Sequence, residues 1–399
     1  MYKVYCRSYQ GVFRVVSRIL PWRDPELLEG ENSLFKLPPL IKAKGINKVL
    51  IVTDQGITSI GLMNPLIERL QTEGIEFIIY DKTIPNPTID NIEVALELYK
   101  KNNCEAIVAF GGGSPMDCAK GVGARIARPN KTIPQLKGEL KVRKSIPPLF
   151  AIPTTAGTGS EATVAAIISN SKTHEKYAII DMALMPHYAV LDPLLTVNLP
   201  THITSTTGID ALTHAVEAYI GKSNTTETRQ YSLEATKLIF ENLLEAYSNG
   251  SNLSARTNMQ KAAYLAGAAF TRAFVGYVHA IAHTLGGFYS IPHGLANAIV
   301  LPYVLEYYGS VVHKPLSELA DHVGISEATD TTEQKSKKFI EAIKSLNQQM
   351  NIPTKVSGIV DLDIPVMVDR AFKEANPLYP VPRILDKKDL YYLYDLIKE

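Results

Sequence analysis

The sequence predicts an α/β domain over residues 1–200, followed by an all-helical domain over residues 201–399. Two observations predict this fold class. Short β-branched runs alternate with helix-length segments up to about residue 200, which is typical of a mostly parallel sheet covered on both faces. From residue 204 onward, apolar residues recur at helical spacing and strand-like runs nearly vanish. The boundary is therefore expected near residues 196–203.

The strands of the α/β half are predicted from short apolar runs. These runs cover residues 49–52, 77–80, 107–110, 149–152, 164–168, 178–180 and 189–191. Amphipathic stretches such as 62–73 and 90–101 separate the first four and are expected to be helices. The later runs lie closer together, so we expect an antiparallel hairpin that joins the same sheet. The segment 129–148 contains several Lys and Pro residues and is expected to be a surface excursion.

The helices of the second half are predicted from the 3.6-residue period of the apolar positions. They cover residues 209–220, 229–247, 255–288, 295–308 and 334–349. The glycine pair Gly286–Gly287 is expected to end the third of them. The polar stretch 322–334 reads as a loop between helices.

The composition excludes several classes of protein. With Lys+Arg 41 against Asp+Glu 40, the chain has a formal charge of +1 and is a poor candidate for non-specific binding to nucleic acid or to an anionic membrane. Three cysteines among 399 residues form no disulfide framework. The first residues lack the apolar stretch of a signal peptide, and no apolar run approaches the roughly 20 residues of a spanning helix. We therefore expect a soluble cytoplasmic protein.

A glycine-rich loop follows the strand that ends at Phe110. Gly111–Gly113 lead into a predicted helix in which Ser114 is the expected N-cap, Pro115 the first residue and Asp117 the capping-box acid. Glycines allow a ligand to approach the backbone, and the free N–H groups of a helix N-terminus suit a pyrophosphate. The alternative is a tight turn without a ligand.

Two more polar features follow predicted strands. Asp54 would accept hydrogen bonds from ribose hydroxyls and repel a 2′-phosphate, which favours NAD over NADP; its alternative role is to cap the next helix. In the loop 152–163, hydroxyl side chains suit a phosphate or a ribose, and the alternative is an ordinary connection rich in turn formers. These hydroxyls belong to Thr154, Thr155, Thr158 and Ser160.

One aspartate and four histidines lie in two short segments of the helical half. Asp210 and His214 are four residues apart, as are His279 and His283, and His293 follows after a turn. This spacing puts each pair on one helix face. Because a buried polar group without a partner costs about 1–3 kcal/mol, a shared cation is the better explanation. Nitrogen and oxygen ligands without thiolate fit Fe(II), Zn(II), Co(II) or Mn(II).

Four motifs together resemble the iron-containing (group III) alcohol dehydrogenases. They are GGGSPMDCAK at 111–120, IPTTAGTGSEAT at 152–163, GIDALTHAVEAY at 208–219 and GYVHAIAHTLGGFYSIPHGLANAI at 276–299. With IVTD and PNPT they cover roughly residues 45–310. The fourth motif, with its three spaced histidines, is highly specific.

The resemblance implies the fold and the roles of the site residues. The fold would be a Rossmann-like dinucleotide-binding domain followed by a helical metal-binding domain, with the active site in the cleft. Asp210, His214, His279 and His293 would bind the metal, which would be Fe(II) or, alternatively, Zn(II). His283 would lie beside the substrate and nicotinamide and serve as the catalytic residue that passes the proton. The dinucleotide, NAD or alternatively NADP, would contact Asp54, Asn86, Gly112, Gly113, Ser114, Asp117, Thr154, Thr155, Thr158 and Lys176.

The implied activity is hydride transfer between the nicotinamide cofactor and a small primary alcohol, diol or aldehyde, in a homodimer or higher homo-oligomer. Two alternatives remain open. A lyase or synthase of the dehydroquinate type would need a phosphate-binding pocket rich in Lys and Arg, and no basic cluster lies near the histidine motifs. A protein that binds metal or nucleotide without catalysis is the other. The first forty residues could extend a dimer interface, cover the cofactor cleft or reshape the substrate entrance.

Overall fold

The computed structural model describes residues 1–171 and 175–399, which form two compact units. One unit is Pro21–Asn198, and the other combines Met1–Leu20 with Leu199–Glu399. The chain thus changes unit between Asn198 and Leu199. The first twenty residues belong to the helical unit, whereas the sequence placed them in an α/β domain of residues 1–200.

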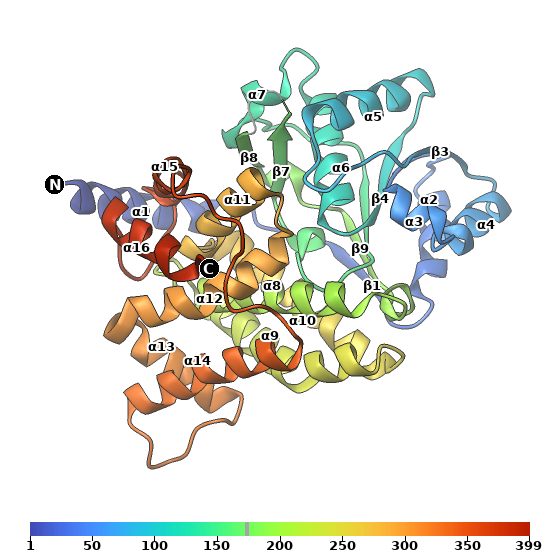
Figure 1. Cartoon of the computed structure of the whole chain (residues 1–399). Coiled ribbons are helices and arrows are strands. Elements are labelled where there is room, and N and C mark those ends of the chain that lie inside the picture. The colour runs from blue at the N-terminus through green and yellow to red at the C-terminus, as the bar shows by residue number, and fades with distance from the viewer. Residues whose placement is uncertain (172–174) are drawn as a thin grey trace. The chain divides into compact units, whose positions relative to one another are not determined.

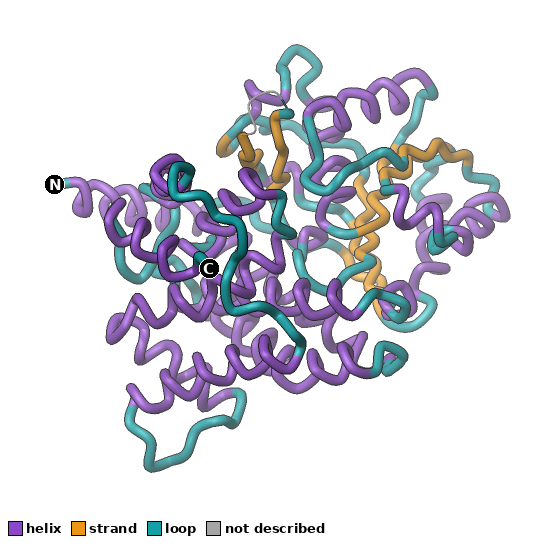
Figure 2. Tube along the Cα trace, viewed as in Figure 1, coloured by secondary structure: helices purple, strands orange, loops and turns teal. Residues whose placement is uncertain are grey.

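A parallel sheet is the centre of the α/β unit, which confirms the predicted fold class (Figures 1 and 2). Its strand order over the described residues is β1-β9-β6-β4-β2-β3. The bounds are β1 (Glu26–Glu29), β2 (Lys48–Val52), β3 (Glu76–Tyr80), β4 (Ala106–Gly111), β6 (Leu149–Pro153) and β9 (Tyr188–Leu191). Each predicted run of this sheet therefore forms a strand, and β1 adds an edge that was not predicted.

Helices cover both faces of this sheet, and side chains alternate between the two faces along each strand, so the sheet contributes to two apolar clusters. Leu50 and Val52 of β2 face one apolar cluster, with residues of α5 and α6. Val49 and Ile51 face the other, with residues of α2 and α4. The helices are α2 (Leu37–Ala43), α3 (Gln55–Ser59), α4 (Asn64–Thr72), α5 (Ile89–Lys101), α6 (Gly113–Ala127) and α7 (Ile133–Leu136).

The predicted hairpin is present but does not join the main sheet. β7 (Ala165–Asn170) and β8 (Glu175–Ile180) are antiparallel and form a second sheet with β5 (Gly138–Glu139). One physical reason is Lys120 of α6, whose ammonium donates to the Ala165 carbonyl at 2.9 Å and so holds the start of β7 against that helix.

The segment 129–148 is more than a surface excursion. It contains α7 and β5, and its apolar side chains at Ile133, Leu136, Val142 and Ile146 are buried. Its Lys and Pro residues indicated exposure, whereas the widely spaced apolar residues pack into the core beside α6.

The second unit is helical (Figure 2). Its helices are α1 (Tyr2–Ile19), α8 (Thr201–Ile220), α9 (Thr226–Ser248), α10 (Leu253–Ala273), α11 (Tyr277–Tyr289), α12 (His293–Tyr308), α13 (His313–His322), α14 (Thr332–Gln349), α15 (Ile364–Ala375) and α16 (Lys387–Ile397). Among the described residues, the helical run from His293 to His322 is long and apolar enough to cross a bilayer. However, 61% of its most apolar stretch is buried inside the protein, as is usual for a core helix.

The predicted helix over 255–288 is in fact two helices. α10 and α11 are bent by 104° at a break around Phe274, whose φ is 66°. The break exists because Glu217 of α8 accepts hydrogen bonds from the backbone N–H groups of Gly276 and Val278, at 2.8 and 2.9 Å. These groups would otherwise belong to a continuous helix.

The sequence predicted that the glycine pair at 286–287 ends α11, and this prediction is wrong. The helix continues to Tyr289 and ends where Ser290 takes a φ of 55°. A glycine inside a helix costs only about 1 kcal/mol. The packing of α11 against α12 and α15 outweighs that cost.

The N-terminal helix α1 is fixed to the C-terminal part of the helical unit. Arg7 donates to the carbonyls of Val381 and Pro382 at 2.8 and 2.9 Å. Gln10 donates to the Tyr379 carbonyl at 2.7 Å. The Tyr2 ring stacks on the ring of Phe372. These contacts explain why residues 1–20 group with the helical unit.

Candidate metal centre and dinucleotide site

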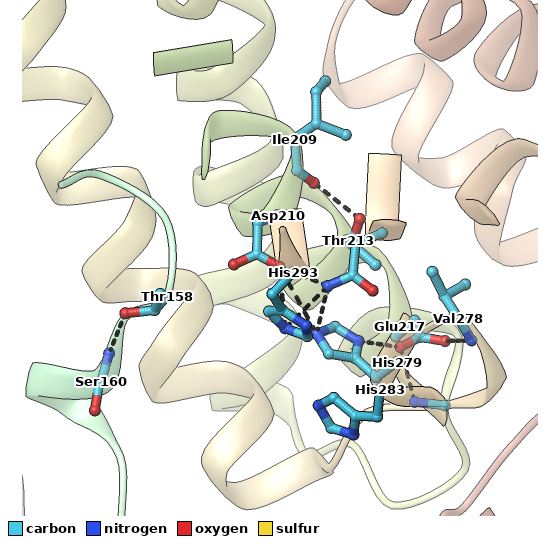
Figure 3. A network of polar contacts seen from close by, with 12 residues as sticks. Thr158, Ser160, Ile209, Asp210, Thr213, Glu217, Val278, His279, His283 and His293 are labelled. Atoms are coloured by element: carbon cyan, nitrogen blue, oxygen red, sulfur yellow. Dashed lines mark hydrogen bonds and ion pairs between the residues drawn. The ribbon is translucent and has the colours of Figure 1, made fainter. Parts of the chain in front are cut away.

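Four predicted ligands come together in the helical unit. Figure 3 shows three of them, Asp210, His279 and His293. Each of Asp210, His214, His279 and His293 offers one ligand atom, and these atoms all lie within 4.8 Å of one another. The Oδ1 atom of Asp210 is 3.6 Å from His293 Nε2 and 4.0 Å from His279 Nε2. Asp210, His214 and His279 are buried, whereas the His293 side chain is 27% exposed.

The cluster exists because three helices present one face each. α8 contributes Asp210 and His214 one turn apart, α11 contributes His279, and α12 begins at His293. A close approach of α12 to α8 brings His293 into place. A Cβ atom on Gly294 would lie 2.5 Å from the carbonyl oxygen of Thr206, so only glycine allows this approach.

Glu217 orients one of these ligands and was missed by the sequence analysis. Its carboxylate lies 2.6 Å from Nδ1 of His279 (Figure 3). A carboxylate only accepts, so Nδ1 carries the proton and the Nε2 lone pair is left for a cation. The signal was present in the sequence, because Glu217 lies three residues after His214 and seven after Asp210 on the same helix face.

Asn297 is the second residue that the sequence analysis missed. It lies one turn after His293 and is fully buried. Its amide nitrogen donates to Asp210 Oδ1 at 2.6 Å and lies 3.3 and 3.2 Å from Nε2 of His279 and His293. Among the described residues, its carbonyl oxygen has no hydrogen-bond partner. Asn297 therefore bridges three of the four ligand residues.

This arrangement fits a divalent cation. One carboxylate and three imidazoles are the nitrogen and oxygen donors that Fe(II) and Zn(II) accept. A buried carboxylate facing imidazole nitrogens is stabilised by a positive charge among them. The partial exposure of His293 leaves one side of the cluster accessible, which is a property of catalytic rather than structural metal sites.

His283 lies beside the cluster but is held by a different carboxylate. Its Nδ1 is 2.6 Å from Oε1 of Glu374, which also accepts from the Tyr379 hydroxyl at 2.9 Å. The ring centroid of His283 is 5.1 Å from that of His293. On the other side of the cluster, the ring of Phe270 stacks on His214 with centroids 4.2 Å apart.

In the α/β unit, the two polar loops meet at the carboxyl ends of the neighbouring strands β4 and β6. The Thr154 N–H donates to the Gly111 carbonyl at 3.1 Å. A Cβ on Gly112 would lie 3.4 Å from Thr155 Oγ1, and one on Gly113 would lie 3.0 Å from the Thr158 methyl. The glycines thus keep the backbone of one loop close to the hydroxyls of the other.

Ser114 was predicted to be the N-cap of α6, and this prediction is wrong. The helix begins at Gly113 and its N-cap is Gly112, because the chain turns two residues earlier than the Ser-Pro pair indicated. The Ser114 hydroxyl instead accepts from the Asn86 N–H at 3.2 Å. Two predicted dinucleotide contacts are therefore in direct contact with each other.

Asp117 also differs from its predicted capping-box role. Its Oδ1 accepts from the Ser160 hydroxyl at 3.2 Å and so joins α6 to the second polar loop. Burial raises the pKa of Asp117 to about 6, against the opposing effect of the charges on Lys120 and Lys176. The charge of Lys176 on β8 therefore acts on a residue in the second turn of α6.

Lys120 fixes the second polar loop from within the core. Its ammonium, fully buried, donates to carbonyl and hydroxyl oxygens of Ser160 and Thr163 at 2.7–3.0 Å. Burial lowers the pKa of Lys120 to about 8 and raises that of the nearby Glu161 to about 7. The motif GGGSPMDCAK thus ends in the residue that positions the other loop.

Asp54 takes up the alternative role considered for it. Its Oδ1 accepts from the Ile57 N–H at 3.1 Å, and Asp54 is the N-cap of α3. It also lies at the carboxyl end of β2, where open α/β sheets bind ligands. The cap uses the Oδ1 atom of the carboxylate.

A parallel sheet with a glycine-rich loop, in a chain whose helical unit carries an Asp–His cluster, defines a class of metal-dependent oxidoreductases. Two family models match this chain. Residues 25–193 match the description "Iron-containing alcohol dehydrogenase", and residues 204–397 match "Fe-containing alcohol dehydrogenase family, C-terminal". The chain belongs to the iron-containing alcohol dehydrogenase family.

Named relatives agree over most of the chain. Alcohol dehydrogenase 4 of Saccharomyces cerevisiae (strain YJM789) is 42% identical over 350 residues, 87% of this chain and 90% of the relative. The 1,3-propanediol dehydrogenase of Citrobacter freundii is 37% identical over 92% of this chain and 95% of its own length. The solved structure of a 1,3-propanediol oxidoreductase superposes with a TM-score of 0.90 at 35% identity, covering 95% of this chain and 99% of that one. The protein is thus an NAD(P)-dependent alcohol dehydrogenase of the iron type.

Proposed function

We propose that the protein transfers a hydride between NAD and a small primary alcohol, diol or aldehyde, at a divalent metal held by Asp210, His214, His279 and His293. The single observation that carries this proposal is the convergence of these four ligand atoms within 4.8 Å. Fe(II) is the proposed native ion, with Zn(II) as the alternative. When bound, the ion supplies Lewis acidity that stabilises negative charge on the substrate oxygen.

The residues around the cluster have distinct proposed roles. Glu217 and Asn297 hold His279 and Asp210 in ligand geometry. His283 is the proposed catalytic residue that passes the alcohol proton toward solvent. Glu374 fixes its Nδ1 proton, so Nε2 is the atom that exchanges the proton.

The dinucleotide is proposed to bind to the two polar loops of the α/β unit. The backbone of Gly112, Gly113 and Ser114 and the hydroxyls of Thr154, Thr155 and Thr158 are the proposed phosphate and ribose contacts. Asn86, Asp117 and Lys176 complete this set. Asp54 would accept from the adenosine ribose hydroxyls, which favours NAD over NADP.

The range of substrates is proposed from the relatives. One is named a 1,3-propanediol dehydrogenase and another, 31% identical, a lactaldehyde reductase of Escherichia coli. Both names describe short, oxygenated carbon chains, so we propose aldehydes and alcohols of about two to four carbons. We also propose a homodimer or higher homo-oligomer in the cytoplasm, a reducing compartment that suits three free, buried cysteines.

Oxidation of NADH by short aldehydes tests the function. Protein stripped with a chelator should show turnover only after Fe(II) or Zn(II) is added. His279→Ala should lose this turnover, whereas the exposed-site variant Glu241→Gln should keep it. Absence of turnover with either metal in the wild type would refute the proposal.

The cofactor preference has its own test. Asp54→Ser keeps a helix-capping side chain but removes the negative charge. We expect the Kd for NADPH to fall at least tenfold and that for NADH to rise. An unchanged ratio of the two Kd values would mean that Asp54 serves only as the cap of α3.

A further inference from the structure

Helix α1 presents two apolar faces, and only one of them is covered. The inner face packs on the helical unit through Tyr2, Cys6, Gln10 and Phe13. The opposite face, here called the outer face, consists of Val4, Tyr5, Val12, Val15, Val16 and Ile19. Spacings of three, four and seven residues place these six side chains on one side of the helix.

The outer face is open to solvent. Val12 is 66% exposed, Val15 64% and Ile19 79%. Gly11, within the same face, has nothing within 4 Å of a built Cβ. Six exposed apolar residues on one face of an 18-residue helix, interrupted only by Ser8 in the middle of that face, are more than the scattered apolar residues of an ordinary surface.

The charges on α1 all have one sign. The helix sequence carries four basic residues and no acidic one, and the first acidic residue of the chain is Asp24. Arg7 faces inward, where it donates to the carbonyls of Val381 and Pro382. Lys3 and Arg14 are exposed and lie eleven residues apart, on one flank of the outer face, and are here called the basic stripe. The net charge of +1 for the whole chain conceals this local surplus.

α1 is also separate from the matched enzyme fold. The family match begins at residue 25, whereas α1 ends at Ile19. The contacts described above fix its inner face, so α1 is a rigid addition to the helical unit.

We propose that α1 docks the enzyme on an anionic lipid surface, with the outer face at the boundary of headgroups and acyl chains and the basic stripe on lipid phosphates. An amphipathic helix with basic residues and an exposed apolar face is typical of such interfacial binding. A second copy of the chain fits less well, because it would bring an equal surplus of positive charge to the contact.

Vesicle flotation with purified full-length protein tests this proposal. The probes are vesicles of phosphatidylglycerol and phosphatidylcholine at 1:3, and vesicles of phosphatidylcholine alone. We expect binding to the anionic vesicles, at least tenfold weaker binding to the neutral ones, and weakening by 0.5 M NaCl.

Variants separate the outer face from general hydrophobicity. The triple variant Val12→Gln, Val15→Gln, Ile19→Gln keeps good helix formers and should lose at least tenfold in vesicle affinity. The matched control Val360→Gln, Leu362→Gln, Val366→Gln replaces three exposed apolar residues elsewhere on the same unit and should bind as wild type. Lys3→Gln with Arg14→Gln should lose the preference for anionic vesicles, and it decides the question if the triple variant fails to fold.

Three outcomes would overturn the proposal. In the first, the wild type does not bind anionic vesicles. In the second, the control triple variant loses as much vesicle binding as the outer-face triple variant. In the third, the wild type does not bind vesicles and sedimentation velocity shows that the outer-face triple variant is a monomer where the wild type is an oligomer. The last result would assign the outer face to a second copy of the chain. Turnover in vesicle-free buffer should be equal in wild type and outer-face triple, which separates this proposal from the proposed catalytic function.

Discussion

At the residue scale, Glu217 accepts from three donors at once. Its two oxygens bind the N–H groups of Gly276 and Val278 and the Nδ1 proton of His279. In Glu217→Gln, one acceptor is replaced by an NH₂ group that faces a donor. We expect metal affinity to fall by about 10–100-fold and the free energy of unfolding to fall by about 1–3 kcal/mol. Competition with a chelator for Co(II) and urea denaturation measure the two effects.

Glu241→Gln is the matched control for this variant, because Glu241 is exposed on α9 and lies 3.9 Å from Lys237. It should leave both quantities unchanged. If Glu217→Gln lowers stability but leaves Co(II) affinity as in wild type, Glu217 serves the helix start alone and does not position His279.

Glu161 gives the α/β unit a dependence on pH. Burial raises the pKa of Glu161 from 4.5 to about 7, so the folded protein holds this proton more tightly than the unfolded chain. The stabilisation is present in full below pH 4.5 and is lost as pH rises through 7. Over this window it amounts to about 3 kcal/mol, because one pKa unit corresponds to about 1.4 kcal/mol.

Glu161→Gln should remove this dependence, since an amide resembles the protonated acid. Between pH 5 and pH 8, the melting temperature of the wild type should fall by several degrees relative to the variant. The control Glu97→Gln changes an exposed carboxylate on α5 and should follow the wild type. Parallel curves for wild type and Glu161→Gln would contradict the argument.

At the element scale, the approach of α12 to α8 depends on Gly294. An added Cβ would meet the Thr206 carbonyl at 2.5 Å, and backbone atoms within a helix cannot move aside cheaply. Gly294→Ala should therefore push the start of α12 away and carry His293 from Asp210. We expect at least tenfold weaker binding of Co(II) and a melting temperature lower by several degrees.

Gly286→Ala is the control, because the nearest atom to its Cβ would be the Ile291 carbonyl at 3.5 Å. Alanine in a helix is favoured over glycine by about 1 kcal/mol, so this variant should be as stable as wild type or slightly more so. Equal metal affinity in both variants would show that α12 has freedom to adjust.

Elements set by local periodicity were predictable, and those set by distant contacts were not. Strands β2, β4 and β6 follow from their own apolar runs. The break between α10 and α11 follows from Glu217, almost sixty residues earlier, and no local pattern announces it. The same holds for the hairpin β7–β8, which Lys120 holds against α6. The convergence of the Asp–His cluster was predictable because the spacing of its residues is itself helical, whereas Asn297 and Glu217 resemble ordinary polar residues of a helix.

At the scale of the whole molecule, each proposed site lies within one unit. The four proposed metal ligands belong to Leu199–Glu399, and the proposed dinucleotide contacts belong to Pro21–Asn198. The change of unit beside residue 199 follows from the loss of strand-like runs in the sequence. The sequence does not indicate that α1 belongs to the helical unit, because this placement depends on contacts with the carbonyls of Val381 and Pro382 near the other end of the chain.

This division predicts that metal and dinucleotide stabilise different units. A ligand at 100 times its Kd adds about 2.7 kcal/mol to the unit that binds it. The only tryptophan, Trp22, lies in the α/β unit and reports its unfolding by fluorescence, while the far-ultraviolet circular dichroism is dominated by the helical unit.

Removing the metal with EDTA should lower the urea midpoint seen by circular dichroism more than the midpoint seen by Trp22 fluorescence. NADH should raise the midpoint seen by Trp22 fluorescence more than the midpoint seen by circular dichroism. Asp210→Asn should abolish the response to EDTA and keep the response to NADH. Equal shifts of both signals with both ligands would show instead that the chain unfolds as one cooperative unit, in which each site supports the stability of the other.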